Sequence, residues 1–222
     1  MRAARKDGLA TRQRLLDAAT EIFADRGYAG ATVSEICDRA GANLAAVNYH
    51  FGGKDELYAE TWRVAFADAL AAYPSDGGLA EDSAPEQRFH AFVRSLLHRI
   101  LERGKRGHGG KLLLSEIAQP TKAIESVRTE AIRPLFEQSR SLMRELLGPQ
   151  VDDKSAAFAT MSVVNQCLAI GFQRGRFPAF QHFVEMAVED VEGLAEHITR
   201  FSLAGLSAVR AKAEAPSEGD SR

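Results

Sequence analysis

The sequence predicts an all-α protein with a compact three-helix head and a larger helical body. Apolar residues recur at helical spacing along nearly the whole 222-residue chain, and no segment shows a convincing strand pattern. Glycines and capping residues divide the N-terminal part into short helical segments. We predict the head in residues 1–54, the body in 55–210 and a disordered tail in 211–222, where apolar periodicity ends.

The composition is ordinary for a soluble globular protein, and the formal net charge is −2. A nearly neutral chain is not drawn as a whole to nucleic acid or membranes, so any basic surface must be local. No segment is expected to serve as a transmembrane helix, and Cys37 and Cys167 lie in apolar helical patterns that suit reduced, buried thiols. We therefore expect a cytoplasmic protein without membrane contact. Basic residues gather near the N-terminus, at Arg2, Arg5, Lys6, Arg12 and Arg14.

Each helix of the head has a start or stop signal. The first helix is expected to end at Gly27. Thr32 and Glu35 form a capping box at the start of the second helix, which ends at Gly41. Asn43 is placed to cap the third helix. The first helix buries an apolar stripe made of Leu15, Leu16, Ala19, Ile22 and Phe23.

The body begins with a fourth helix, which runs from about Asp55 to Ala72 and has acidic residues in its first turn. The segment "YPSDGGLAEDSAPE" is expected to be a loop, and "GKRGHGG" a second, mobile loop. Pro134 should kink the long helix that contains it. The remaining helices are predicted at about residues 86–103, 111–118, 121–147, 154–173 and 188–209.

The head has the plan of a helix-turn-helix, because three short helices are joined by a tight turn at Gly41. In this motif the last helix enters the DNA major groove. Its small residues Ala45 and Ala46 permit close approach of the backbone. Asn48 is suited to pair with an adenine edge. The stretch therefore predicts a sequence-specific DNA contact.

Other head residues supply contacts to thymine or to phosphate. Leu44 and Ala45 are placed to touch a thymine methyl group. The Thr32 hydroxyl and N–H lie at a helix N-terminus, which favours anions. Charge contacts from the N-terminal arm would make binding depend on salt. The predicted DNA-binding residues are Arg12, Thr32, Asn43, Leu44, Ala45, Asn48, Tyr49, His50 and Lys54.

The segment "TRQRLLDAATEIFADRGYAGATVSEICDRAGANLAAVNYHFGGKDELY" resembles the N-terminal domain of the TetR family of transcriptional regulators. The body resembles the C-terminal domain of the CecR-like (YbiH-like) branch in "EIAQPTKAIESVRTEAIRPLF" and "HITRFSLAGL". The resemblance implies a homodimer, usually a repressor, that binds a pseudo-palindromic operator and releases it when a small molecule enters the body.

The chain departs from the family pattern at several DNA-facing positions. Many relatives have tyrosine in place of Asn48, so their base preference does not carry over. Gly53 stands where a serine commonly caps the fourth helix. A Lys-Gly-Thr run is replaced by Leu44, Ala45 and Ala46, which removes a threonine contact to phosphate.

The resemblance also places the ligand pocket and the dimer interface in the body. Two strongly apolar helices, which contain Met161 and Phe201, would pack against their twins as a four-helix bundle. The pocket would lie among the helices that begin near residues 86, 111, 121 and 154. Aromatic and methionine side chains there would suit an apolar or aromatic ligand, although each residue singly fits ordinary core. The predicted lining is Phe89, Phe92, Leu96, Leu113, Ile117, Phe136, Met143, Phe158, Met161 and Gln166.

Two other classes of protein were weighed against this interpretation. An enzyme is disfavoured, because the six histidines form no tight metal-ligand pattern and Ser115 lies outside a G-x-S-x-G motif. No glycine-rich phosphate loop is present, so neither metal nor cofactor is expected. A non-catalytic helical protein-interaction module stays as the alternative. Such a module would have no use for the run Asn48, Tyr49 and His50 between the buried Val47 and Phe51.

Overall fold

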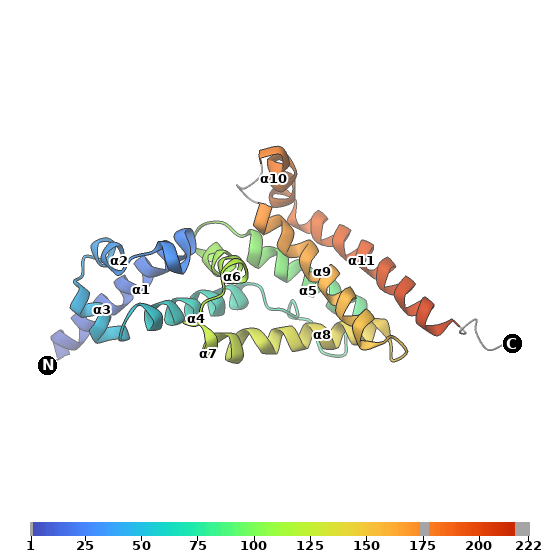
Figure 1. Cartoon of the computed structure of the whole chain (residues 1–222), viewed down its shortest axis with the longest axis horizontal. Helices are drawn as coiled ribbons and strands as arrows, with labels where there is room; N and C mark the ends of the chain where they lie inside the picture. Colours follow the sequence, from blue (N-terminus) through green and yellow to red (C-terminus); the bar gives the residue numbers. More distant parts are fainter. Residues whose placement is uncertain (1, 174–177, 216–222) are drawn as a thin grey trace. The chain divides into compact units, whose positions relative to one another are not determined.

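The computed structural model describes residues 2–173 and 178–215, and every regular element in that part is a helix, which confirms the all-α prediction (Figure 1). The first four helices are α1 (Arg2–Gly30), α2 (Val33–Ala40), α3 (Leu44–Phe51) and α4 (Lys54–Ala72). They are followed by α5 (Pro85–Leu101), α6 (His108–Ala118), α7 (Glu125–Val127), α8 (Arg133–Leu147), α9 (Asp153–Gln173), α10 (Gln181–Glu189) and α11 (Val191–Glu214).

The chain divides into two compact units. The first, called the head unit below, comprises Met1–Ala72 and Glu102–Arg133, and the second, the body unit, comprises Tyr73–Leu101 and Pro134–Arg222. The head unit is larger than the three-helix head of the sequence analysis, because α4 and α6 pack with α1. Tyr58 and Trp62 on α4 are completely buried in this packing.

Aromatic rings join the end of α1 to the start of α4 in the head unit. Gly27 interrupts α1 with φ 68°, as its expected role at a helix end requires. The ring of Tyr58 then lies 4.8 Å from that of Phe23 and 5.1 Å from that of Tyr28. The Tyr28 hydroxyl donates to Asp55, and this bond raises the pKa of Tyr28 to about 12. The first turn of α4 is thereby fixed against α1.

The segment "GKRGHGG" is not a mobile loop as predicted. Residues Gly104–Gly107 form a 3₁₀ turn, and α6 begins directly after it at His108. A side chain on Gly109 would place its Cβ 2.7 Å from the Ala65 carbonyl oxygen and 3.0 Å from the Ala69 Cβ. The glycine is therefore needed where α6 passes close to α4, and the sequence pattern did not distinguish close packing from flexibility.

The long helix around Pro134 differs from its prediction in two ways. It begins at Glu125 rather than Thr121, and Arg128–Ile132 forms a π-helical turn directly before α8. Proline lacks an N–H and its ring clashes with the carbonyl group four residues earlier in an α-helix. A wider turn relieves both problems. The sequence therefore predicted where the α-helix is interrupted, but not that the interruption is a π-helical turn.

The body unit contains one helix more than the sequence predicted. The single helix expected at 188–209 is replaced by α10 and α11, with Asp190 between them accepting a hydrogen bond from the Gly193 N–H at 2.8 Å. The helix α11 also runs to Glu214, so the first residues of the predicted tail are helical. The rest of that tail, 216–222, lies outside the described residues.

Charged side chains hold α5 against α11. Arg94 contacts the Glu192 carboxylate at 2.7 Å, and His98 reaches the same carboxylate at 2.9 Å. The Arg94 guanidinium is the main reason that the pKa of Glu192 is lowered to about 2. Behind this contact, Phe89, Val93 and Leu97 of α5 are completely buried.

Among the described residues, one helix is long and apolar enough to cross a membrane by length and composition alone. It is α9, with 21 residues and a mean hydropathy of 1.3, whereas the sequence analysis expected no such segment. Core helices meet the same criteria, and Val163, Cys167 and Leu168 of α9 are buried within the body unit. The exposed apolar residues of α9 are considered below.

We expect Gly109→Ala to lower the melting temperature, because the added methyl group forces α6 away from α4. Overpacking of this kind costs about 1–3 kcal/mol, and each 1 kcal/mol corresponds to roughly 2–4 °C for a chain of this size. Gly8→Ala is the matched control, since Gly8 also lies in a helix and a Cβ there would meet only the His50 ring, at an ordinary contact distance of 3.9 Å. Calorimetry that shows equal melting temperatures for the two variants would contradict the close-packing role.

Candidate nucleic-acid interface

The ends of α2 and α3 are fixed by the caps that the sequence predicted. The Thr32 hydroxyl accepts from the Glu35 N–H at 3.2 Å, and the Glu35 carboxylate accepts from the Thr32 N–H at 3.3 Å. Gly41 takes the left-handed conformation with φ 59°. Asn43 then accepts from the Ala46 N–H at 3.0 Å. The turn between the two helices therefore has a defined geometry.

The helix α3 has one buried and one exposed face. Val47 is completely buried in the head unit, whereas Leu44 is 59% exposed and Tyr49 is 84% exposed. Ala45 and Asn48 are exposed on the same side. The Asn48 side chain forms no hydrogen bond within the described part of the chain, so its amide group is available to an external partner.

Two cationic or titratable side chains border this exposed face. The Lys54 ammonium lies 4.3 Å from the centre of the Tyr28 ring, at the first residue of α4. The His50 ring packs edge to face with Tyr49 at 4.9 Å between centres. Both side chains are half-buried, and ring contacts limit the conformations they adopt.

Thr32 has donors that are already occupied. Its hydroxyl donates to Glu35 at 3.0 Å, and its N–H donates to the same carboxylate. These bonds and the neighbouring Arg26 guanidinium lower the pKa of Glu35. A phosphate at Thr32 would have to displace Glu35. The phosphate contact therefore stays a prediction, and breaking these hydrogen bonds would make it less favourable.

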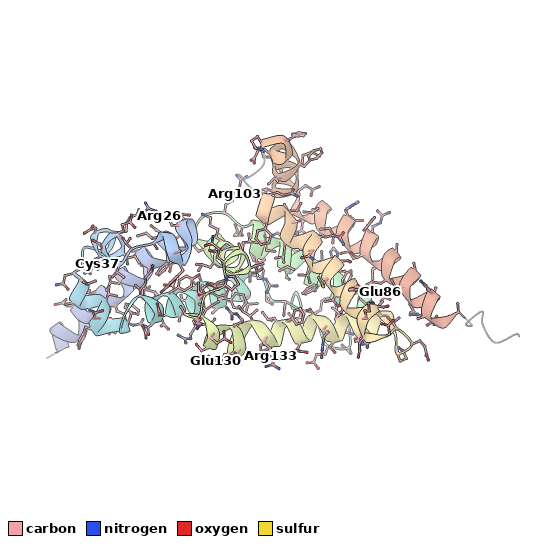
Figure 2. The ribbon with its side chains drawn as sticks, in the orientation of Figure 1. Arg26, Cys37, Glu86, Arg103, Glu130 and Arg133 are labelled. Atoms are coloured by element: carbon pink, nitrogen blue, oxygen red, sulfur yellow. The ribbon has the colours of Figure 1, made fainter. Side chains whose placement is uncertain are left out.

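Figure 2 shows Arg26 near the end of α1 and Cys37, which is buried, on α2.

Arg12 of α1 contacts both α3 and α4 and so links three helices of the head unit. Its guanidinium lies over the Phe51 ring of α3 at 4.9 Å and contacts the Glu60 carboxylate of α4 at 2.6 Å. This contact is the main cause of the lowered pKa of Glu60. Sequence reasoning placed Arg12 on a phosphate and had no signal for Glu60, which lies 48 residues away. The side chains of Arg2, Arg5 and Lys6 lie outside the described residues.

Arg14 and Glu116 have structural roles that the sequence did not show. Arg14 donates to the Ala40 carbonyl oxygen at 3.1 Å and so satisfies the end of α2. Glu116 on α6 is buried, and accepts from the Tyr58 hydroxyl at 2.9 Å and from the Thr121 N–H at 2.9 Å. Burial and this carboxylate raise the pKa of Tyr58. A buried carboxylate therefore joins α4 to α6.

The predicted ligand-binding residues are distributed over several places in the part of the chain that the structure describes. Phe136 of α8 and Met161 of α9 share a cavity of about 840 Å³ in the body unit. Phe92 and Phe158 border two other hollows of that unit, and the remaining residues line neither these nor the first cavity. Among them, Phe89, Leu96 and Met143 are buried on α5 and α8, Gln166 is half-buried on α9, and Leu113 and Ile117 lie on α6 of the head unit.

The walls of the 840 Å³ cavity are more polar than the sequence analysis expected. They combine apolar residues with charged and amide side chains from α8 and α9. The sequence analysis placed a pocket among these helices but missed these residues, because helical spacing alone does not show which polar side chains line a cavity. The additional lining residues are Glu137, Arg140, Ser141, Arg144, Asp153, Ala156, Ala157, Thr160, Val164 and Asn165. Within the described residues, no group of three or more His, Cys, Asp and Glu side chains could hold a metal ion.

We expect Arg12→Gln and Glu60→Gln each to lower the melting temperature, and the double variant to be destabilised by less than the sum of the two single effects. A partly exposed pair of this kind couples by about 0.2–1 kcal/mol. The pKa of Glu60 is lowered in the folded protein, so its contribution is present above the unfolded value near 4.5 and is lost as the pH falls below it. If the two single effects on stability simply add in the double variant at pH 7, the coupling between Arg12 and Glu60 is contradicted.

Two family models together match most of the chain. Residues 15–61 match the model for bacterial regulatory proteins of the tetR family, and residues 85–206 match the C-terminal domain of the HTH-type transcriptional dual regulator CecR. CecR of Shigella flexneri is 26% identical over 175 residues, which cover 73% of this chain and 76% of that protein. SrpR of Pseudomonas putida is 47% identical over 90 residues, which cover 40% of this chain and 39% of that regulator.

Solved structures show the same fold. A TetR-like transcriptional regulator from Rhodococcus sp. RHA1 aligns with a TM-score of 0.63 at 21% identity, over 89% of this chain and 96% of that one. A second Rhodococcus regulator aligns with a TM-score of 0.61 at 17% identity, over 89% and 96% of the two chains. Because the CecR-type domain model alone spans more than half of the sequence, the chain belongs to the TetR family of bacterial transcriptional regulators, in its CecR-like branch.

Proposed function

We propose that this regulator binds a pseudo-palindromic operator as a homodimer, acts as a repressor and releases DNA when a small molecule binds to its body. The exposed face of α3 is the observation that carries the DNA-binding part of this proposal. Asn48 has no side-chain partner among the described residues, and Tyr49 is 84% exposed. Both lie on a helix whose opposite side is anchored by the buried Val47. Exposed groups of this kind on a rigid support are suited to external recognition.

In this proposal, Asn48 recognises a base of the operator. Its amide can donate to and accept from one adenine edge in the major groove. Leu44 and Ala45, on the same exposed side, offer apolar contact to a thymine methyl group. Tyr49, His50 and Lys54 would hold phosphates and fix the register of α3 on the duplex. Asn43 supports these contacts by capping α3 rather than by a free side chain.

Selection from random duplex DNA at fixed salt tests the proposal. We expect the full chain to recover an inverted repeat. Asn48→Ala should lose discrimination at one base pair of each half-site, at a cost of about 1–3 kcal/mol per pair. Tyr49→Ala is the comparison, since it should weaken binding to all sequences alike. An unchanged base preference in Asn48→Ala would contradict base reading by this residue.

Failure to enrich any sequence, in protein shown to be folded, would favour the second candidate. That candidate is a helical protein-interaction module without catalysis. We propose no catalytic activity, no membrane contact and a cytoplasmic location, because the family consists of transcriptional regulators.

Exposed apolar side chains on α9, α10 and α11 support the homodimer. Phe158 and Met161 on α9 are each 59% exposed, and Phe201 on α11 is 67% exposed. On the same helices Cys167, Ile198 and Leu206 are buried within the unit. The apolar stripes therefore serve both an internal core and a second surface. A second copy of the chain is the partner that the family provides for this surface.

We expect Phe201→Glu to convert the protein to a monomer, because a carboxylate would be buried in the subunit interface. Leu79→Glu is the matched control, since Leu79 is also exposed but lies in the loop before α5. Sedimentation of both variants at equal concentration measures the outcome. A dimer that persists in Phe201→Glu would exclude the α11 surface from the interface.

The cavity between α8 and α9 is our candidate for the effector site. Its volume of about 840 Å³ lies within the range of small-molecule pockets, which is roughly 300–1,000 Å³. Phe136, Met161 and Val164 give it apolar walls, and Asn165 gives it an amide. Most of the other predicted lining residues belong to the same unit, whereas Leu113 and Ile117 lie on α6 of the head unit.

Release of DNA would pass through α4, which is covalently continuous with the body unit at Tyr73. The Tyr58–Glu116 hydrogen bond joins α4 to α6, and Glu116 also accepts from the Thr121 hydroxyl at 2.7 Å. A shift of the α6–α7 connection would therefore be transmitted to α4. Movement of α4 would change the spacing of the two recognition helices in the dimer.

A further inference from the structure

The helix α5 contains a buried arginine that lacks a partner. Arg99 is 7% exposed, and its Nη1 atom is enclosed with no hydrogen-bond partner among the described residues. Burial lowers the pKa of Arg99 to about 10, and no nearby charge contributes to this shift. The side chain therefore stays protonated at neutral pH while it is held out of water.

The other arginines of α5 show how unusual this is. Arg88 contacts the Glu145 carboxylate at 2.5 Å, and Arg94 contacts Glu192 at 2.7 Å. Both are more exposed than Arg99 and need a counter-charge less. A buried cation destabilises a fold unless an anion pairs with it. The most buried arginine of α5 is the one without its anion, so a structural role does not account for it.

Arg99 lies on the same side of α5 as Phe92 and Arg88, two residues that border α8. It follows Phe92 by seven residues and Arg88 by eleven, and these spacings place the three on one side of a helix. Phe92 and Arg88 border a hollow of about 130 Å³ together with Ser139 and Leu142 of α8. This side of α5 thus offers an aromatic ring, an apolar contact and, further along, an unpaired guanidinium.

We propose that Arg99 anchors an anion-binding site in the body unit, which takes a small molecule with a carboxylate or phosphate group on an apolar frame. The planar guanidinium can bind either oxyanion through two parallel N–H donors. Phe92 and the buried apolar residues of α5 would contact the frame. Arg99 does not line the 840 Å³ cavity between α8 and α9, so this would be a second small-molecule site of the body unit. A link between this second site and the release of DNA rests on the proposed function, whereas the anion site itself does not.

Melting of the full chain without ligand gives the first test. Replacing Arg99 by methionine removes an unpaired buried charge and keeps much of the volume, so Arg99→Met should raise the melting temperature by roughly 2–4 °C or more. Arg94→Met is the matched control and should lower it, because Glu192 loses its main partner and keeps only His98. A fall in Arg99→Met as large as that in Arg94→Met would overturn the proposal, since it would show a structural role.

Binding of simple probes gives the second test. Benzoate, octanoate and octyl phosphate at millimolar concentration should raise the melting temperature of the natural chain, whereas benzamide and octanol should not. Comparing the two carboxylates with octyl phosphate shows which of the two oxyanions the site binds. The affinity for the active probe should fall about tenfold or more in Arg99→Met, since a charged hydrogen bond is lost, and less in Arg99→Lys. No stabilisation by any anionic probe, or equal stabilisation of Arg99→Met, would overturn the site.

A third measurement separates this site from the proposed regulation. The active probe is added to the protein bound to its selected operator, with the natural chain and Arg99→Met in parallel. Release from the natural chain alone supports regulation of DNA binding through the Arg99 site. Binding through Arg99 without release supports the anion site and contradicts a regulatory role for it. Absence of any operator contradicts the proposed function and leaves the first two tests unaffected.

Discussion

The DNA-facing surface depends on one constraint, which is that an eight-residue helix cannot hold its shape alone. Isolated helices of this length are marginal in water. The structure supplies what α3 lacks from outside it. Asn43 and Gly52 close its two ends, Val47 buries its inner side, and the Arg12 guanidinium presses on Phe51. These contacts use the whole inner face of α3, so its outer face is left free for recognition.

Local signals explain why the head was largely predictable. The capping box at Thr32, the left-handed Gly41 and the cap at Asn43 each depend on residues within a few positions of one another. The same glycine signal failed at Gly109, where the reason for glycine is the neighbouring helix α4. The separation of α10 from α11 was also missed, although Asp190 is a cap residue, because apolar periodicity continues on both sides of it.

Sequence analysis could single out candidate site residues that are exposed, but not those that are buried. Asn48 and Tyr49 were identified because polar and aromatic residues stand where the pattern demands a surface. Arg99 and Glu116 could not be found in this way, because their meaning comes from burial and from the presence or absence of partners far along the chain. A charged residue in a helix looks the same in sequence whether it is solvated or enclosed.

The π-helical turn at Arg128–Ile132 holds one residue more than an α-helical turn would. The wider turn rotates the chain less per residue, so it takes up this extra residue without changing the direction in which the side chains of α8 point. If the same five residues formed an α-helical turn instead, α8 would be rotated by up to about 100°. Leu142 and Met143, which are buried in the core, would then be turned away from it. The turn before Pro134 thus lets the chain carry one more residue than an α-helix needs and still keep the inner face of α8 in place.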